Sequence, residues 1–212
     1  FRNSLVRLNN QLYYSLYNIA KANGVIIGKE NYLYEENYIK AYYGMDFVGQ
    51  QKINTVLNKL TAIDSVFRSL NKTLLIVFAP GKASFYPEYI PDYYRRANDS
   101  TNYTCYKNSI EKTGLHFIDF NEWFIEQKRK SNILLYPKTG IHWSDYGAVL
   151  AIDSINNYIS KLRRYEPVDM YWNEFDKDPD KVSSVDADIE YGMNLLINIK
   201  KPELKYPILC YN

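Results

Sequence analysis

The amino-acid sequence predicts an α/β domain of three layers, with helices on both faces of a central, mainly parallel sheet. Two observations carry this prediction. The apolar run LLIVFAP at 74–80 has the length of a strand buried on both faces, and a second β-prone run, LHFIDF, follows at 115–120. Segments with helical periodicity precede, separate and follow these two runs, an alternation that is typical of parallel sheets.

Five segments are predicted to form helices because their apolar residues recur at intervals of three and four. They are residues 4–22, 50–70, 101–112, 121–130 and 144–164. One face of the first helix carries Leu5, Leu8, Leu12, Leu16 and Ile19. After it, the β-prone runs Val25–Ile27 and Tyr32–Tyr34 flank Gly28-Lys29-Glu30-Asn31, which predicts a hairpin over 25–34.

After Arg164 the periodic pattern fades. The stretch 174–190, EFDKDPDKVSSVDADIE, is acidic and rich in turn residues, so we expect an excursion over the surface. We therefore divide the chain into an α/β domain over 1–164 and an irregular extension over 165–212. Two or three central strands are few for a doubly wound sheet, so we expect the sheet to be incomplete and further chain to follow Asn212. The start at Phe1 rather than Met indicates removal of an upstream segment, which is equally a signal peptide, a membrane anchor or a cloning choice.

The composition argues against several classes of function. Lys and Arg total 26 against 24 Asp and Glu, a net charge of +2, and no basic stripe indicates a nucleic-acid partner. No apolar stretch approaches the roughly 20 residues of a membrane span. Cys105 and Cys210 lie far apart without a CxxC pair, which argues against zinc and leaves a disulfide open. We expect neither a metal nor a cofactor. The 22 tyrosines fit either stacking on sugar rings or the codon bias of an AT-rich genome.

The segment TGIHWSDYGA, residues 139–148, is the best candidate for chemistry. Ser144 fits a helix N-cap, Asp145 suits the positive end of the helix dipole, and Trp143 can pack on the helix as a hydrophobic staple. Together they fix where His142 points. A histidine just before a helix is available as a neutral general base near pH 7, although the same residues also fit a buried, hydrogen-bonded core histidine.

Three segments together resemble the alginate O-acetyltransferase AlgX/AlgJ-related group of the SGNH hydrolase superfamily. GKENYLYE resembles the group's G-x-x-G-x-L-F/Y hairpin, and FAPGKASFYPEYIP resembles its P-x-K-x-x-x-Y loop. TGIHWSDYGA resembles its D-x-H-W-x-x-x-G motif. The three segments occur in the group's order and spread over about residues 24–160, so their combination is more specific than any one motif.

The resemblance implies an extracytoplasmic domain, in the periplasm or cell envelope, that handles acetyl esters on polysaccharide. In this group the histidine is the base of a Ser-His-Asp triad, so His142 would activate a serine for attack on an acetyl donor. Lys82 and Tyr86 match the loop motif and Trp143 follows the histidine, so we expect these three to bind substrate. The implied partners are an acetylated glycan or polysaccharide and a membrane protein that donates acetyl groups. The oligomeric state stays open.

Two departures from the group's pattern concern the triad. Gly140 stands where the group has the aspartate that orients the imidazole. We expect Asp119, at the end of a predicted strand, to replace it, with a turn or cap role as the alternative. The G-D-S-[FLY] motif of the nucleophile does not occur in the sequence. In the group it follows the histidine, so we expect the serine beyond Asn212, with Ser84 as the internal alternative.

Two functions follow as hypotheses. The first is an O-acetyltransferase or acetylesterase domain for a cell-envelope polysaccharide, with His142 as general base and the serine outside this chain. The second is a non-catalytic glycan-binding or assembly protein on an inactive hydrolase scaffold. Gly140 supports the second, and the aromatic loop from Phe85 to Tyr94 would supply its stacking surface.

Overall fold

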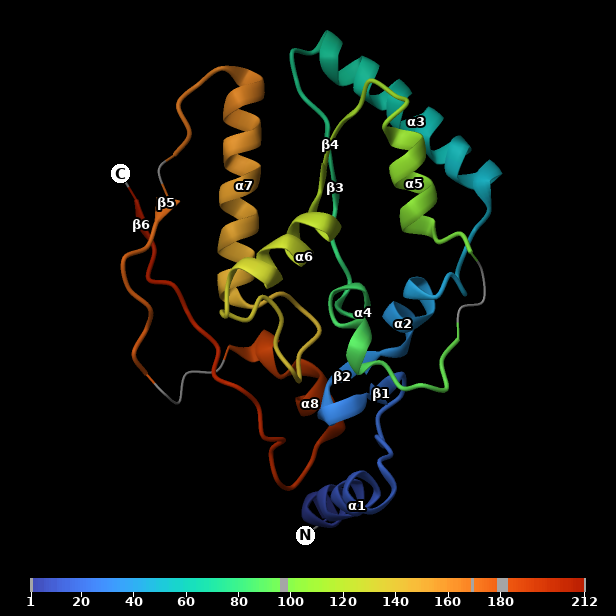
Figure 1. Cartoon of the computed structure of the whole chain (residues 1–212), viewed down its shortest axis with the longest axis vertical. Helices are drawn as coiled ribbons and strands as arrows, with labels where there is room; N and C mark the ends of the chain where they lie inside the picture. The colour runs from blue at the N-terminus through green and yellow to red at the C-terminus, as the bar shows by residue number, and fades with distance from the viewer. Residues whose placement is uncertain (1, 96–98, 169, 179–182, 212) are drawn as a thin grey trace. The chain divides into compact units, whose positions relative to one another are not determined.

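The computed structural model in Figure 1 describes residues 2–95, 99–168, 170–178 and 183–211. The chain forms two compact units. The first combines Phe1–Glu36 with Phe124–Asn212, and the second is Asn37–Trp123. The boundary expected after Arg164 lies inside the first unit. The α/β class is confirmed, with an N-terminal helix, a hairpin and a small, incomplete sheet that contains a parallel pair.

The parallel pair lies in the second unit and consists of β3 (Leu75–Phe78) and β4 (His116–Asp119). Both predicted strands are confirmed. The expectation that the first of them is buried on both faces is wrong, because none of its four residues is fully buried and Val77 is 37% exposed. In a two-stranded sheet both strands are edge strands. Each therefore has a neighbouring strand on one side only, which leaves its residues partly exposed.

Helices α3 (Gln50–Ser69) and α5 (Asn102–Ile110) pack with this pair (Figure 1). Their common core consists of the buried residues Ile53, Leu57, Ile110 and Leu115. The predicted apolar face of α3 is buried only in its first half, since Ile63 and Leu70 are 45% and 59% exposed. Three shorter elements of this part of the chain were not predicted: α2 (Glu36–Tyr42), α4 (Lys82–Phe85) and η2 (Pro87–Tyr89). Helix α6 (Phe120–Lys130) spans the point where the two units divide.

The first unit begins with α1 (Arg2–Tyr17), which is shorter than predicted because Asn18 takes the left-handed conformation with φ 54°. The predicted hairpin follows as β1 (Val25–Ile27) and β2 (Leu33–Glu35), which pair antiparallel through η1 (Lys29–Asn31). Helix α7 (Asp145–Arg163) begins at the predicted N-cap Ser144. The remaining elements are β5 (Met170–Tyr171), η3 (Ser184–Asp186), α8 (Asp188–Met193) and β6 (Cys210–Tyr211), with β5 and β6 antiparallel.

The core of the first unit joins the hairpin to α8. Its buried members are Ile27, Leu33, Ile141, Ile189, Met193, Leu195 and Ile199. The surface excursion expected over 174–190 is therefore wrong for its last part, where Asp186, Ala187 and Glu190 are at most 3% exposed. Residues 179–182 of that stretch lie outside the described residues. Cys105 and Cys210 are both free thiols, so they do not form the disulfide that the sequence left open.

Candidate functional site

His142 lies in the first unit, in the loop that leads into α7, and Ser144 fixes this loop. The buried Ser144 Oγ donates to the Leu134 carbonyl at 2.7 Å and accepts from the Gly147 backbone N–H at 3.1 Å. The Ser144 backbone N–H donates to the Leu135 carbonyl at 2.9 Å. The His142 side chain is 63% exposed, so the alternative of a buried core histidine is wrong. An exposed imidazole on a fixed loop is accessible to a reactant.

Trp143 anchors the same loop by packing. Its Nε1–H donates to the Tyr136 hydroxyl at 2.6 Å, and its ring lies against Phe124 with centroids 4.8 Å apart. These contacts give Trp143 a structural role next to His142. Its role in substrate binding stays a prediction.

Asp188, the first residue of α8, is the carboxylate partner of His142. Its Oδ2 lies 3.3 Å from the His142 Nε2. Its Oδ1 accepts the backbone N–H groups of Ile141 at 2.9 Å and Ile189 at 2.8 Å. Because one donor is the residue before His142 and the other is in α8, the carboxylate joins the two segments and its orientation is fixed. With Nε2 facing the carboxylate, Nδ1 is the ring nitrogen left to accept a proton.

Gly140 is required by the close approach of the segment that carries Asp188. A Cβ on residue 140 would overlap the Val185 carbonyl oxygen and lie 2.7 Å from the Asp186 carbonyl carbon. The approaching segment is bonded to Thr139, whose hydroxyl donates to the Asp186 carbonyl at 3.3 Å and whose carbonyl accepts the Glu190 N–H at 3.2 Å. The backbone of residues 185–186 therefore occupies the space that an aspartate side chain at position 140 would need.

Sequence reasoning missed Asp188 because its acidic stretch was interpreted as surface. One signal was available. Gly140 in place of an expected aspartate indicates that another segment approaches this position closely, and a glycine often marks such an approach. The helix that begins at Asp188 was not predicted, so the position of this carboxylate at a helix start gave no signal.

Two further acids of the same segment are buried and hold it in place. Asp186 Oδ2 accepts the Tyr206 hydroxyl at 2.6 Å and the Ser183 N–H at 3.1 Å. Burial raises the pKa of Asp186, and the bond from Tyr206 partly offsets this. Burial and the bond to Asp186 also raise the pKa of Tyr206. Glu190 accepts the Ile199 N–H at 2.7 Å and the Lys201 ammonium at 2.8 Å.

Asp119, expected as the acid of the triad, has partners within the second unit. Its Oδ2 accepts the Tyr103 hydroxyl at 2.8 Å and lies 3.3 Å from the Lys107 Nζ. Its Oδ1 accepts the Asn121 N–H at 2.9 Å, which is the cap role left as the alternative. Burial, followed by the bond to Asp119, raises the pKa of Tyr103. Asp119 as a partner of His142 stays a prediction, whereas Asp188 has the contact.

The loop residues expected to bind substrate are buried in the second unit. Lys82, the first residue of α4, is fully buried, and Tyr86 is 4% exposed. The Tyr86 ring packs against Phe85 and Tyr89 with centroids 4.6 Å and 5.7 Å apart. Substrate binding by Lys82 and Tyr86 stays a prediction.

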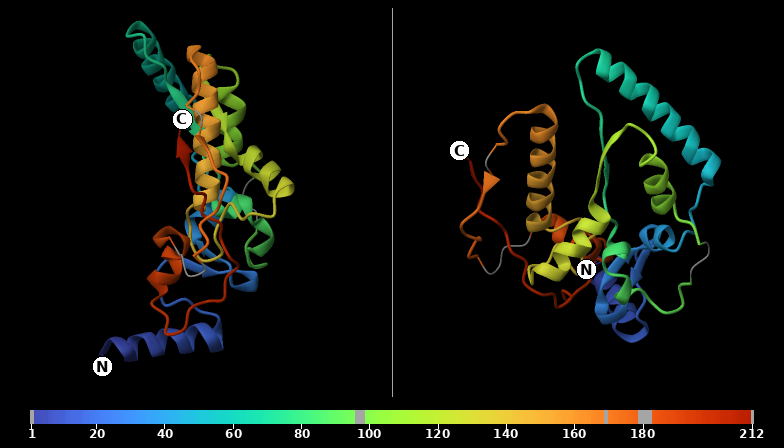
Figure 2. Two further views of the ribbon diagram at one scale, coloured as in Figure 1. Left: turned by 90° about the vertical axis from the view of Figure 1, so that its left-hand side faces the viewer. Right: turned by 45° about the horizontal axis from the view of Figure 1, so that its top comes forward.

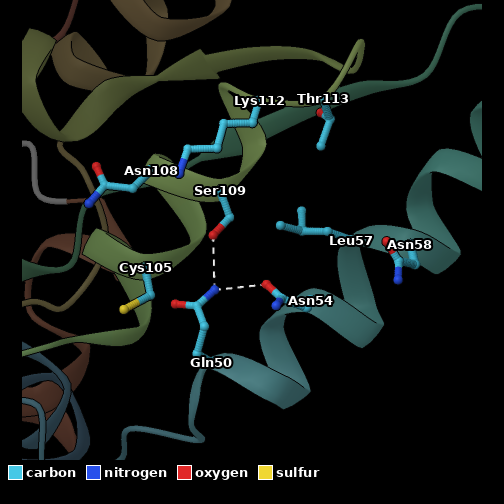
Figure 3. Close-up of a pocket in the computed structure, with 9 residues that line it drawn as sticks. All are labelled: Gln50, Asn54, Leu57, Asn58, Cys105, Asn108, Ser109, Lys112 and Thr113. Atoms are coloured by element: carbon cyan, nitrogen blue, oxygen red, sulfur yellow. Dashed lines mark hydrogen bonds between the residues drawn. The ribbon is translucent and has the colours of Figure 1, made fainter.

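A pocket of about 550 Å³ lies between α3 and α5 within the second unit (Figure 3). The side chain of Gln50 in α3 links the two helices at this pocket. Its Nε2 donates to the Ser109 Oγ of α5 at 3.0 Å and to the Asn54 Oδ1 of α3 at 2.8 Å. Its lining residues are Gln50, Asn54, Leu57, Asn58, Cys105, Asn108, Ser109, Lys112 and Thr113. This lining holds no carboxylate or imidazole, and it includes none of the site residues predicted from the sequence.

Comparison with known proteins places these features in one family. Residues 25–172 match the family model described as SGNH hydrolase-like domain, acetyltransferase AlgX. The fold is similar to the O-acetyltransferase domain of Pseudomonas putida AlgJ, with a TM-score of 0.57 and 14% identity over 89% of this chain. The chain spans 66% of that chain, just under two thirds. Bacillus cereus PatB1 matches with a TM-score of 0.44 and 13% identity, over 77% of this chain and 52% of that one. No curated protein matches the chain.

Replacing Gly140 by alanine should lower the free energy of unfolding by about 1–3 kcal/mol, because the new methyl group must displace the backbone at Val185. Gly192→Ala in α8 is the matched control, since nothing lies within 4 Å of its Cβ position. It should be neutral or stabilising by up to about 1 kcal/mol. Urea unfolding measures both, and equal stability of the two variants would contradict the close approach.

Asp186 should make unfolding depend on pH. Its folded pKa is raised above the ordinary value of 3.8, so its stabilising contribution is fully present below that value. This contribution is lost as the pH rises through the raised pKa. The wild type should therefore gain stability relative to Asp186→Asn as the pH falls from 7 towards 4. Urea unfolding at several pH values measures this difference, and a difference that shrinks on acidification would refute the prediction.

Proposed function

Because the chain belongs to the AlgX family of SGNH hydrolase-like acetyltransferase domains, we propose that it transfers or hydrolyses O-acetyl esters of a cell-envelope polysaccharide, with His142 as general base. The observation that carries this proposal is the pairing of His142 with Asp188. The histidine of the family's motif is present as His142, exposed on a fixed loop. Gly140 replaces the motif's aspartate, but the Asp188 carboxylate lies 3.3 Å from the imidazole.

In the proposed mechanism Asp188 positions the imidazole. Its Oδ2 lies 3.3 Å from the His142 Nε2, and in the reaction it comes to accept the Nε2–H, which leaves the lone pair on Nδ1. Nδ1 takes the proton of a serine hydroxyl as its oxygen attacks the acetyl carbonyl, and the negative charge of Asp188 stabilises the imidazolium that forms. The imidazolium then returns the proton to the departing alcohol, which leaves an acetyl-serine for transfer to a second hydroxyl or to water.

The nucleophile is proposed to be a serine outside these 212 residues, as expected from the sequence. Ser144, the serine nearest to His142 in sequence, is occupied as the buried N-cap of α7 and bonds the Leu134 carbonyl. Ser84, a half-buried residue of α4, is the internal alternative. A full-length Ser84→Ala variant that keeps acetyl-ester turnover would remove this alternative.

The substrate, location and donor complete the proposal. An O-acetyltransferase of this family would take an acetylated glycan, outside the cytoplasm, in the periplasm or cell envelope. A membrane protein is the proposed acetyl donor, and Lys82, Tyr86 and Trp143 are the proposed substrate contacts. The non-catalytic alternative was supported by Gly140 in place of the motif's aspartate, with the aromatic loop from Phe85 to Tyr94 as its stacking surface. The Asp188 carboxylate, 3.3 Å from the His142 Nε2, offsets the loss of that aspartate and so favours catalysis.

His142→Ala should abolish acetyl-ester turnover in the full-length protein, and Asp188→Asn should lower kcat by about 10²–10⁴-fold. The asparagine keeps the size of the side chain but donates where the imidazole needs an acceptor. Asp145→Asn is the matched control, because Asp145 lies in the same motif but starts α7. Its kcat should change little. Initial rates with a chromogenic acetyl ester measure all three variants.

Two results would contradict the proposal. One is turnover by His142→Ala at the wild-type rate. The other is equal loss of kcat in the Asp188→Asn and Asp145→Asn variants, which would mean that the motif matters for folding rather than for proton transfer. Circular dichroism of each variant shows whether it is folded, so that a lost rate is assigned to chemistry.

A further inference from the structure

Helix α1 turns its apolar side to solvent. An amphipathic helix on a globular protein normally packs its apolar stripe on the core. In α1 the stripe is outside instead, with Leu5, Leu8, Leu12 and Leu16 exposed by 50%, 44%, 48% and 68%. Figure 2 shows α1 as a separate helix at the edge of its unit, beside the hairpin and the segment after α8.

The polar side of α1 holds it in this orientation. The Arg7 Nε donates to the Leu195 carbonyl at 2.9 Å, and the buried Asn10 Nδ2 donates to the Met193 carbonyl at 2.9 Å. The Gln11 Oε1 accepts the Ile197 N–H at 3.0 Å. These residues recur at intervals of three and one along one side of the helix, opposite the leucines. Rolling α1 to bury its leucines would break all three bonds, so the outward stripe is a fixed feature.

The loop that receives α1 has two exposed apolar residues of its own. Leu196 and Ile197 are 45% and 67% exposed, and Ile197 is bonded directly to α1. We call Leu5, Leu8, Leu12, Leu16, Leu196 and Ile197 the α1 patch. A row of exposed leucines along one side of a helix, with further exposed apolar residues in the loop that receives the helix, indicates an interaction site.

The charges around the patch indicate what covers it. Residues 1–28 contain Arg2, Arg7 and Lys21 and no Asp or Glu. Arg2 and Lys21 are exposed. A second copy of α1 packed on the first would bring like charges together, with no carboxylate in the helix to pair with them. A surface with acidic headgroups instead matches both the apolar stripe and the positive charge.

We propose that α1 docks the protein on a membrane surface rich in acidic phospholipid. The leucine stripe enters the boundary between headgroups and acyl chains, the exposed cations Arg2 and Lys21 contact the phosphates, and the polar side with Arg7 stays bonded to the protein. None of the helices in the described part of the chain is long and apolar enough to cross a membrane. The proposal rests on α1 and the loop that receives it, and it is independent of the activity proposed for His142.

Vesicle co-sedimentation of the 212-residue chain tests this proposal. We expect binding to vesicles of equal parts phosphatidylcholine and phosphatidylglycerol, and at least about tenfold weaker binding to phosphatidylcholine alone. Leu8→Glu with Leu12→Glu should weaken binding to the acidic vesicles at least about tenfold, because it places charge in the stripe. The matched control is Ile63→Glu with Val66→Glu, exposed apolar residues of α3 at 45% and 57%, which should bind as the wild type does.

Three outcomes would overturn the proposal. The wild type could fail to bind the acidic vesicles, or the α1 variant could bind them as well as the control. Alternatively, light scattering could show a wild-type dimer that the α1 variant converts to a monomer, which would make a second copy the occupant. Turnover of a water-soluble acetyl ester by the full-length protein should be the same in both variants, which separates this test from that of the proposed function.

Discussion

The backbone of Val185 and Asp186 packs directly against Gly140, and the geometry of the site depends on this contact. It is possible only because residue 140 has no side chain. The same segment leads into α8, which begins with Asp188. The contact that excludes a carboxylate side chain at position 140 therefore also brings the Asp188 carboxylate to His142. Buried Asp186 and Glu190 hold the segment through Tyr206, Ser183 and the Ile199 N–H. Asp188, between them, is left to face His142.

The sequence predicted the parts of the site that depend on local physics. Ser144 is the N-cap of α7, and His142 is held just before it, as the residue types in the motif indicated. Asp188 comes close to His142 through a contact between segments that are distant in the sequence. Local sequence propensity does not predict such contacts. An acidic, turn-rich stretch is normally solvated, so burial of Asp186 and Glu190 became apparent only with the tertiary structure. For Asp119 the sequence left two roles open, and the structure shows the cap contact, in which its Oδ1 accepts the Asn121 N–H.

The fold was predictable to a similar extent. Periodicity located α3, α7, the two parallel strands and the hairpin, because each depends on its own pattern of apolar residues. It also found α1, but it could not show which side of this helix packs on the protein. Arg7, Asn10 and Gln11 determine the orientation by bonding backbone groups of the last residue of α8 and of the loop that follows it. The polar side of α1 bonds the end of α8 and the loop after it, and Gly140 packs against the residues just before α8. The segment around α8 therefore contacts both the N-terminal helix and the loop that carries His142.

The state of the His142 imidazole tests the central claim most directly. The chain has two histidines, so His116 in β4 serves as an internal reference. Nitrogen chemical shifts of the neutral rings report which nitrogen carries the proton. If Asp188 orients the ring, His142 should be in the Nε2–H form, and Asp188→Asn should shift it towards the Nδ1–H form while His116 is unchanged. A His142 spectrum that is the same with and without the Asp188 carboxylate would contradict the claim.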